Sequence, residues 1–235
     1  MNICGITNVG ESHRIISKRI SAWGRVNFAP YPWRSCGSFW LSLVAEVMLQ
    51  RTRVHAVFPV WQEFAQLFPT PEDLLHKDQL ILDKVMRSLG LQWRARLIRE
   101  LAEALVKRDL RYTDKRSLMA LPCVGDYISS AMLSLFLERR AVIIDSNVVR
   151  WISRMTGNDY DGETRRKGWF KEIADTLTPI TTFRDYNYGV LDFTMTVCTQ
   201  LPNCNLCPVS SYCQYNLSLK AAVESEGYGF NSTPV

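Results

Sequence analysis

The chain has 235 residues, of which 47% are hydrophobic and 22% are charged, and its formal net charge is +5. A chain of this size can fold as one large or two small domains around a real core, and the mild positive charge is only a bias toward polyanions. No apolar run approaches 18 residues, and the N-terminal segment MNICGITNVGESHR lacks the basic and apolar parts of a secretory signal. These features exclude a membrane-spanning or secreted protein, so we expect an intracellular one, in the cytoplasm or nucleoid.

Apolar residues recur mostly at helical spacing along the chain. In chain order, we predict helices within 13–26, 39–50, 55–68, 69–78, 83–90, 92–108, 116–122, 148–155, 165–179 and 184–198. Pro59 predicts a kink or a helix start, and Gly90 predicts a C-cap. Only AVIID (141–145) could form a strand, and it has no obvious partner, while residues 217–235 are expected to be a disordered tail. The predicted fold class is therefore all-α.

Four of the seven cysteines lie in the last sixth of the chain. An odd number of cysteines, without a signal peptide and with this clustering, argues against a disulfide scaffold and favours a metal site. The four side chains, spaced C-x5-C-x2-C-x5-C, are Cys198, Cys204, Cys207 and Cys213. Four thiolates can surround a tetrahedral zinc or a [4Fe–4S] cube, and the spacing leaves both open.

The segment CTQLPNCNLCPVSSYC resembles the iron–sulfur loop of the helix-hairpin-helix DNA glycosylases, the superfamily of endonuclease III and the mismatch adenine glycosylases. Their usual spacing is C-x6-C-x2-C-x5-C, so this chain has one residue fewer between Cys198 and Cys204. The resemblance implies a structural [4Fe–4S] cluster that positions a basic loop against DNA.

The stretch LPCVGDYISSAM (121–132) predicts a tight glycine turn followed by a helix, whose N–H groups could hold a phosphate. Glycine turns between helices are common, so this pattern alone is weak. The stretch is similar to the L-P-G-V-G hairpin of the same family, and VIIDSNVVRWISR is similar to the family's V-D-x-N-V-x-R-V-x-x-R segment. The resemblance implies DNA contacts by Pro122, Cys123, Val124, Gly125, Asn147 and Arg150. Cysteine replaces the family's glycine at 123; if that position needs a positive φ, Cys123 is strained and the grip on DNA weakens.

Two carboxylates are candidates for catalysis. Asp145 precedes a helix and could simply be an N-cap. The resemblance implies that it also stabilises the oxocarbenium-like sugar when the base leaves. Glu46 lies in the most apolar helix, where desolvation would raise its pKa and suit a general acid, although it could instead face solvent or pair with Arg51 or Arg53. AEVMLQRTRV resembles the family's S-E-V-M-L-Q-Q-T-x-V helix, whose glutamate protonates the departing base.

Tyr127 stands where bifunctional members of the family carry the lysine that forms a Schiff base. The resemblance therefore implies a monofunctional enzyme that leaves an abasic site, with Tyr127 lining the pocket; the alternative is that Tyr127 only packs at a helix start. Gln50 and Arg51 are candidates for the side chain that fills the gap left by a flipped base, or else they form an exposed helix end. The basic face WRARLIR could contact phosphates.

Arg51 stands where G·T-mismatch thymine glycosylases have arginine and adenine glycosylases have glutamine. LGLQWRAR lacks the paired tyrosines of the adenine branch, and the chain ends 22 residues after Cys213, too few for that branch's C-terminal domain. We therefore expect excision of thymine or uracil opposite guanine in double-stranded DNA, by a monomer. The alternatives are an adenine glycosylase without the C-terminal domain, a glycosylase for a modified base, or a non-catalytic iron–sulfur DNA-binding protein.

The resemblance implies a two-lobe helix-hairpin-helix fold, with a six-helix barrel lobe over residues 38–147. A cluster lobe combines residues 11–37 and 148–216, and the active cleft lies between the lobes. Residues 217–235 are left as the tail.

Overall fold

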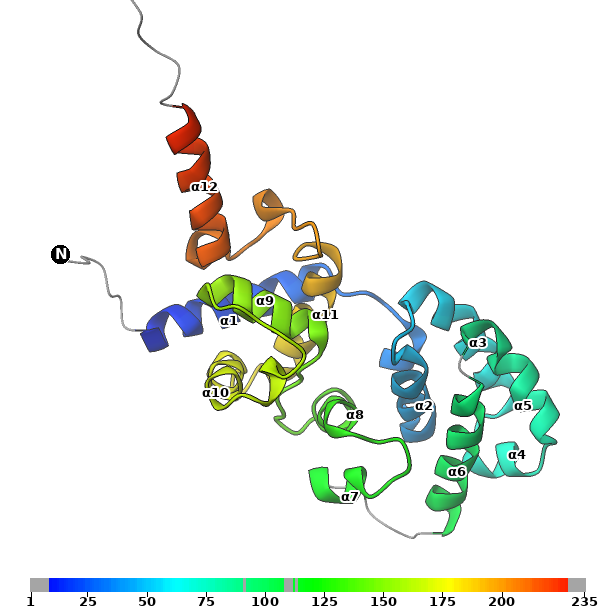
Figure 1. The fold of residues 1–235 in the computed structure, drawn as a ribbon. Helices are drawn as coiled ribbons and strands as arrows, with labels where there is room; N and C mark the ends of the chain where they lie inside the picture. Colours follow the sequence, from blue (N-terminus) through cyan, green and yellow to red (C-terminus); the bar gives the residue numbers. More distant parts are fainter. Residues whose placement is uncertain (1–8, 91, 108–111, 113, 228–235) are drawn as a thin grey trace, which may run out of the picture. The chain divides into compact units, whose positions relative to one another are not determined.

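In the computed structural model of the chain, residues 9–90, 92–107, 112 and 114–227 are described. They contain helices and no strand, which confirms the all-α prediction (Figure 1). The one candidate strand, residues 141–145, is irregular and leads directly into a helix. The described residues contain no helix that is both long and apolar enough to cross a membrane.

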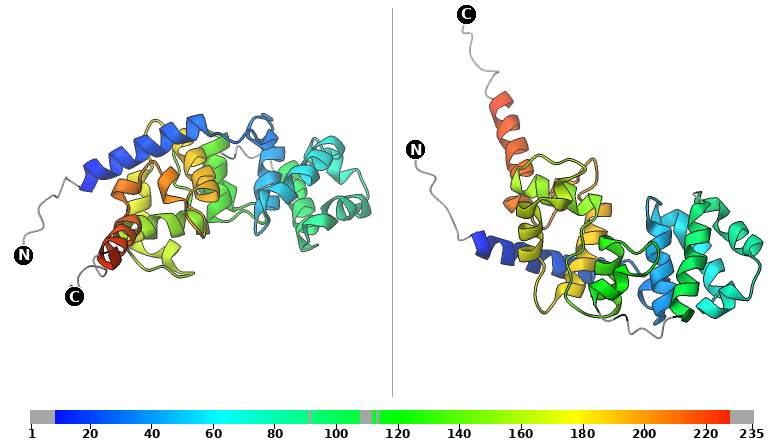
Figure 2. Two further views of the ribbon diagram at one scale, coloured as in Figure 1. Left: turned by 90° about the horizontal axis from the view of Figure 1, so that it is seen from above. Right: turned by 60° about the horizontal axis from the view of Figure 1, so that its bottom comes forward.

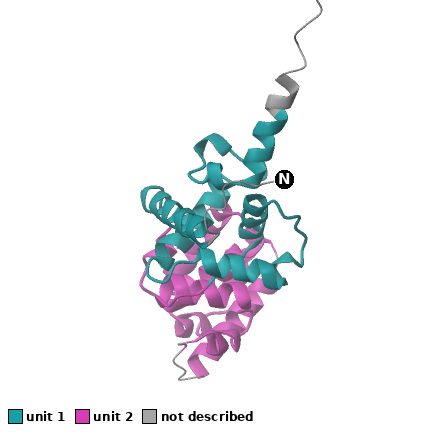
Figure 3. Cartoon of the chain, turned by 90° about the vertical axis from the view of Figure 1, so that its left-hand side faces the viewer, with its two compact units in different colours: residues 1–28, 142–235 teal, residues 29–141 magenta. Residues whose placement is uncertain are grey.

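The chain divides into two compact units (Figure 3). Unit 1 comprises residues 1–28 and 142–235, and unit 2 comprises residues 29–141. The predicted boundaries at 37/38 and 147/148 both lie some residues later in the chain than the structural ones at 28/29 and 141/142. As a consequence, Asp145 belongs to unit 1 and not to the lobe that carries Glu46.

Unit 2 is a cluster of mostly short helices around α2 (Phe39–Leu49). Ser38 caps α2 by accepting a hydrogen bond from the Leu41 amide at 3.2 Å. The remaining helices of this unit are α3 (Val54–Leu67), α4 (Pro71–Leu75), α5 (Gln79–Met86), α6 (Trp93–Lys107), α7 (Lys115–Met119) and α8 (Asp126–Ala131), with 3-10 turns at Pro32–Arg34 and Arg87–Leu89 and a π-helical turn at Met132–Phe136.

Buried indoles fix α2 against α3 in the core of unit 2. Trp40 donates to the Phe68 carbonyl at 3.0 Å, and Trp61 donates to the Leu41 carbonyl at 2.9 Å. Both indoles are almost fully buried, so these hydrogen bonds satisfy donors that would otherwise be costly. Pro59 lies inside α3, so it marks neither the start nor the end of that helix.

Unit 1 has its own core, formed by α1 (Val9–Val26), α9 (Ser146–Thr156), α10 (Gly168–Leu177) and α11 (Phe183–Thr196) (Figure 2). A 3-10 turn at Thr164–Arg166 lies between α9 and α10, and α11 is followed by 3-10 turns at Cys204–Leu206 and Ser210–Tyr212 and then by α12 (Gln214–Gly227). The predicted disordered tail from residue 217 is therefore wrong up to Gly227, where α12 ends; residues 228–235 lie outside the described part.

The most extensive helix contact in unit 1 is between α1 and α11. Gly24 and Gly189 face each other there, and a Cβ built on Gly24 would lie 2.5 Å from the Gly189 Cα. A Cβ on Gly189 would lie 2.7 Å from the Ile20 carbonyl oxygen. Only glycine allows the two backbones to approach this closely.

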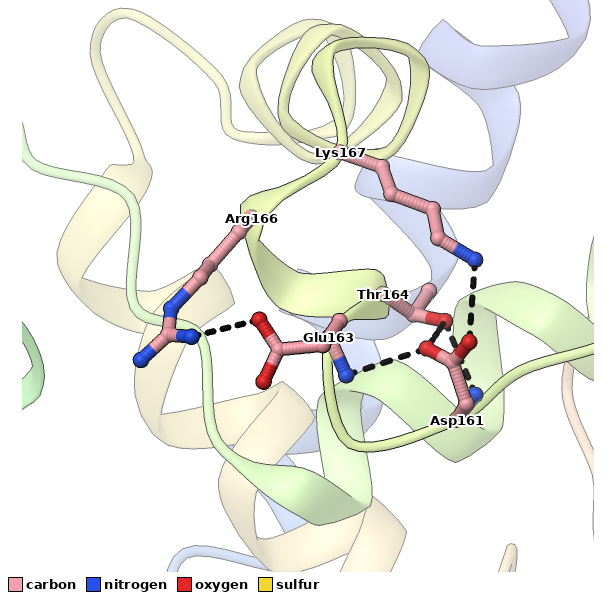
Figure 4. A network of polar contacts seen from close by, with 5 residues as sticks. All are labelled: Asp161, Glu163, Thr164, Arg166 and Lys167. Carbon is pink, nitrogen blue, oxygen red and sulfur yellow. Dashed lines mark hydrogen bonds and ion pairs between the residues drawn. The ribbon is translucent and has the colours of Figure 1, made fainter.

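A polar network shapes the loop between α9 and α10 (Figure 4). Asp161 accepts hydrogen bonds from the Glu163 amide at 3.0 Å and the Thr164 hydroxyl at 2.8 Å, and it forms an ion pair with Lys167 at 3.2 Å. The hydrogen bond from Thr164 and the Lys167 side chain lower the pKa of Asp161. The loop thus reaches α10 in a defined turn, and Glu163 pairs with Arg166 beside it.

Candidate active site and cysteine centre

Glu46 occupies the middle of α2, and almost every side chain of this helix is buried. Glu46 itself is 9% exposed and is surrounded in sequence by the fully buried Ala45, Val47 and Met48. The sequence reading of a buried carboxylate is correct, and the solvent-facing alternative is wrong. A carboxylate in such a site is held for chemistry or for a buried polar contact.

Asp145 is the N-cap of α9, as the simpler of its two sequence interpretations predicts. Its Oδ1 accepts a hydrogen bond from the backbone amide of Val148 at 2.7 Å, and its Oδ2 accepts one from the side-chain Nδ2 of Asn147 at 3.1 Å. Burial raises the pKa of Asp145, and these hydrogen bonds together with the charge of Arg150 oppose that rise. The capping hydrogen bonds fix the position of the carboxylate. They do not prevent it from acting in catalysis, so the two roles are compatible.

Arg150 corrects one sequence expectation. Its guanidinium is buried, 4% exposed, and donates to the Thr194 carbonyl at 2.8 Å and to the Cys198 carbonyl at 2.7 Å. It also donates to Asn147 Oδ1 at 2.8 Å. Because these contacts hold the side chain inside unit 1, Arg150 is not placed to bind a phosphate. It joins Asp145, through Asn147, to the first cysteine of the cluster segment.

The hairpin at 121–125 has the backbone that the glycine pattern requires. Cys123 has φ 57°, in the left-handed region, so the expected strain at this non-glycine position is present. Gly125 is the exposed N-cap of α8 with φ −93°, so it needs no glycine-specific conformation. Pro122 is half-buried, whereas the Val124 side chain is buried in the core, so Val124 could meet DNA only through its backbone.

Tyr127 is the second residue of α8 and packs half-buried against the unit 2 core. The segment after α2 lies in the same unit. Gln50 is the half-buried C-cap of α2, and Arg51 is exposed with φ 57°.

Arg94 is a functional candidate that sequence reasoning placed wrongly, on a solvated basic face. Its side chain is 0% exposed, and it donates to the Met48 carbonyl and the Thr52 hydroxyl at 3.0 and 2.8 Å. The sequence around the basic residues 94, 96 and 99 of α6 does not show which of these arginines is buried. Only the tertiary contact with the segment after α2 reveals it.

The four cysteines of the C-terminal segment line one cavity of unit 1 with about 340 Å³ of empty space, part of it open to solvent. Trp151, Arg154 and Tyr215 also line it. Among the described residues, no three His, Cys, Asp or Glu side chains lie close enough together to share one metal ion.

The thiols of this cavity are largely buried, and a charged side chain lies beside one of them. Burial raises the pKa of Cys198, Cys207 and Cys213, in Cys207 to about 12. Arg154 donates to the Cys198 sulfur at 3.7 Å and to the Gln200 carbonyl at 2.8 Å. Its charge and hydrogen bond favour a thiolate at Cys198, and it fixes the loop that follows.

Unit 2 therefore contains Glu46, Gln50, Arg51, the hairpin and Tyr127, whereas unit 1 contains Asp145, Asn147, Arg150 and the cysteines. Known proteins resemble this chain in sequence and in fold. The chain is similar to a thymine/uracil-DNA glycosylase of Pyrobaculum aerophilum, with 33% identity over 189 residues that cover 77% of this chain and 81% of that protein. It is also similar to an adenine DNA glycosylase of Mycolicibacterium smegmatis, with 29% identity over 188 residues that cover 78% of this chain and 64% of that protein.

Among solved structures, a thermostable thymine-DNA glycosylase is similar with a TM-score of 0.82 and 26% identity, covering 89% of this chain and 99% of that one. The family model of the HhH-GPD superfamily base excision DNA repair proteins matches residues 44–172. That range is more than half of the chain and includes Glu46, the hairpin and Asp145. The chain belongs to the HhH-GPD superfamily of base excision DNA repair proteins.

Proposed function

We propose that this protein is a monofunctional DNA glycosylase that removes thymine or uracil mispaired with guanine in double-stranded DNA. The observation that carries the proposal is the placement of the two carboxylates. Glu46 is buried in an apolar helix, and Asp145 is fixed by the hydrogen bonds of a helix cap. Both lie in the segments whose sequences resemble the catalytic segments of the family.

The chemistry assigned to these groups is hydrolysis of the N-glycosidic bond. The bond between C1′ and the base breaks as the base takes both electrons and gains a proton by way of Glu46, and the sugar becomes oxocarbenium-like. Asp145, ionised, stabilises that positive charge. Water then adds to C1′ and loses a proton, which leaves an abasic site and the free base.

Tyr127 supports the monofunctional assignment, because a phenol cannot form the Schiff base that strand cleavage requires. Among the residues assigned to DNA, Gln50 and Arg51 would enter the stack when the base leaves it, and the Pro122–Gly125 hairpin and Asn147 would meet the strand. The thymine or uracil assignment is supported by the relatives of that name and by arginine at position 51.

We assign a [4Fe–4S] cluster to Cys198, Cys204, Cys207 and Cys213. Four thiolates on one zinc would lie within about 4 Å of one another, since each Zn–S bond is about 2.3 Å. In a cube, each cysteine binds its own iron, so the sulfurs lie farther apart. The four cysteines line one cavity, and their segment resembles the family's iron–sulfur loop, so we favour the cube over zinc. When bound, the cluster would be structural and hold the loop from 198 to 213.

The test is a panel of duplexes that contain G·T, G·U, oxidised-G·A or a modified cytosine, treated with the protein and then with alkali. Cleavage of the G·T and G·U duplexes supports the proposal. Activity only on oxidised-G·A favours the second candidate, an adenine glycosylase, for which the similarity to the Mycolicibacterium protein is the specific observation. Cleavage without alkali, or borohydride trapping of an adduct, would contradict the monofunctional assignment.

A further inference from the structure

The segment that follows α2 is a tight turn with an unusual occupant. The Thr52 amide donates to the Leu49 carbonyl at 3.2 Å, which closes a four-residue β-turn. Gln50 has φ −59° and ψ 117°, and Arg51 has φ 57°. These angles are those of a type II turn, whose third residue is normally glycine or asparagine because φ is positive there. Here the position holds arginine, and its side chain is exposed.

Arg94 of α6 supplies the contacts that stabilise this turn. Its guanidinium donates to the carbonyls of Met48 and Gln50 and to the Thr52 hydroxyl, the Met48 and Thr52 distances being 3.0 and 2.8 Å. The Arg94 side chain is fully buried, and its Nε has no hydrogen-bond partner in the described part of the chain. Burying a cation with one unsatisfied donor costs free energy, so stability alone does not explain why Arg94 is buried here.

The hydrogen bond to the Gln50 carbonyl has a specific conformational effect. Type I and type II turns differ by a flip of the central peptide, which here joins Gln50 to Arg51. The carbonyl of that peptide can accept from Arg94 only in the orientation present. The same orientation requires a positive φ at the next residue, Arg51. Arg94 therefore selects the turn type and, through it, the direction of the Arg51 side chain.

We propose that Arg94 is a positioning residue for base flipping, which holds the Leu49–Thr52 turn in its type II form so that Arg51 is pre-aimed to enter the DNA stack. This rests on the proposed function, in which Arg51 fills the gap left by the flipped base. Burial and the positive charge of Arg51 lower the pKa of Arg94. The two like charges thus repel, which favours an Arg51 side chain turned away from the protein.

The test compares Arg94→Met, Arg51→Ala and the double variant on a G·T duplex with 2-aminopurine next to the mispaired thymine. Its fluorescence rises when the neighbouring base is unstacked, so it reports flipping independently of excision. We expect Arg94→Met to reduce the fluorescence rise and the single-turnover excision rate at least tenfold, with less than a threefold change in duplex affinity. The double variant should be no worse than Arg51→Ala, because Arg94 acts through Arg51.

Arg99 provides a matched control on the same helix. It also donates to two backbone carbonyls, that of Leu74 in α4 at 3.4 Å and that of Lys77 after α4 at 2.8 Å. Arg99→Met should lower the melting temperature and leave the fluorescence rise unchanged. If Arg94→Met fails to fold, Arg94→Lys carries the test, since one ammonium cannot reproduce the planar fork.

Independent, multiplicative losses in the double variant would overturn the positioning role, as would a normal fluorescence rise in Arg94→Met or Arg94→Lys. If the wild type flips the base but excises nothing from any duplex, the proposed function fails while the positioning role is still measured. If the wild type gives no fluorescence rise on any duplex of the panel, the role in flipping is wrong.

Discussion

At the scale of single residues, Asp145 shows how a helix cap and a catalytic group coexist. Desolvation raises its pKa, while the Val148 amide and the Asn147 side chain lower it. If catalysis needs the ionised form, excision should fall as pH drops through a pKa above the ordinary aspartate value. Asn147→Ala removes one of the opposing hydrogen bonds, so we expect the acid limb of the single-turnover rate to move to higher pH. Rates measured between about pH 4 and 9 test this; an unchanged limb would exclude Asp145 as the titrating group.

The same shift has a consequence for stability. A carboxyl group whose folded pKa is raised stabilises the fold below its unfolded pKa, and that contribution is lost as pH rises through the folded pKa. Asp145 in its ionised form therefore costs stability at neutral pH. Asp145→Asn keeps a capping oxygen and removes the charge, so we expect a higher melting temperature at pH 7.5, smaller differences near pH 4, and no excision. A variant that is less stable at both pH values would contradict this account.

Cys123 has a backbone conformation that suits glycine better than cysteine. Its φ of 57° is costly for a side chain with a Cβ and easy for glycine. Cys123→Gly should stabilise the protein by about 1 kcal/mol in urea unfolding, and DNA binding should tighten or stay unchanged. Cys123→Ala keeps the Cβ and is the control, for which no gain is expected. A clear loss of DNA affinity in Cys123→Gly would show that the thiol itself contributes.

At the scale of helices, the α1–α11 contact is the most sensitive to side-chain volume. A Cβ at Gly24 or Gly189 would lie within 3 Å of backbone atoms, which cannot move as a flexible side chain can. We expect Gly189→Ala to destabilise the protein by about 1–3 kcal/mol, measured by chemical unfolding. Gly168→Ala is the control: a Cβ there meets nothing within 4 Å, at the start of α10. Equal effects of the two substitutions would contradict the close-packing explanation.

The sequence predicts local features of these helices well and tertiary ones poorly. Asp145 between an apolar run and a helix predicts an N-cap, and Gly90 predicts a C-cap; the structure has both, because caps depend on neighbouring residues. Arg94 and Arg150 defeat the same reasoning. Arg94 belongs to a predicted basic helix face and Arg150 to the predicted DNA contacts, yet each is buried and donates to carbonyls 44 to 48 residues away along the chain. Helical periodicity cannot distinguish an exposed arginine from a buried arginine that donates hydrogen bonds to a turn distant in sequence.

At the scale of the whole molecule, two cores share no residue. Trp33, Trp40 and Trp61 belong to the core of unit 2, whereas Trp151 and Cys198 belong to that of unit 1. The proposed flipping groups and Glu46 depend on the first core, and Asp145 and the cysteine cavity depend on the second. The resemblance in sequence motifs predicts two lobes, and the boundaries between the units at 28/29 and 141/142 follow from which core each residue joins.

Because the two cores are separate, we expect loss of the cluster to affect unit 1 and not unit 2. Cys204→Ser removes one proposed ligand at a half-buried position, so the change itself costs little packing. We expect purified Cys204→Ser to lose iron and the visible absorbance of the cluster. Amide hydrogen exchange should accelerate in α9 and in the loop after α11, where Arg150 and Arg154 hold the carbonyls of residues 198–200.

The amides of α2 and α3 should keep their protection in the same sample, because the core around Trp40 and Trp61 contains none of the cluster segment. Cys36→Ser, a half-buried cysteine of unit 2, is the matched control and should keep its iron. Uniform loss of protection across both units would mean that the two cores unfold as one. Full retention of iron in Cys204→Ser would instead remove Cys204 from the ligand set, and the shorter spacing between Cys198 and Cys204 would then mark a different mode of binding.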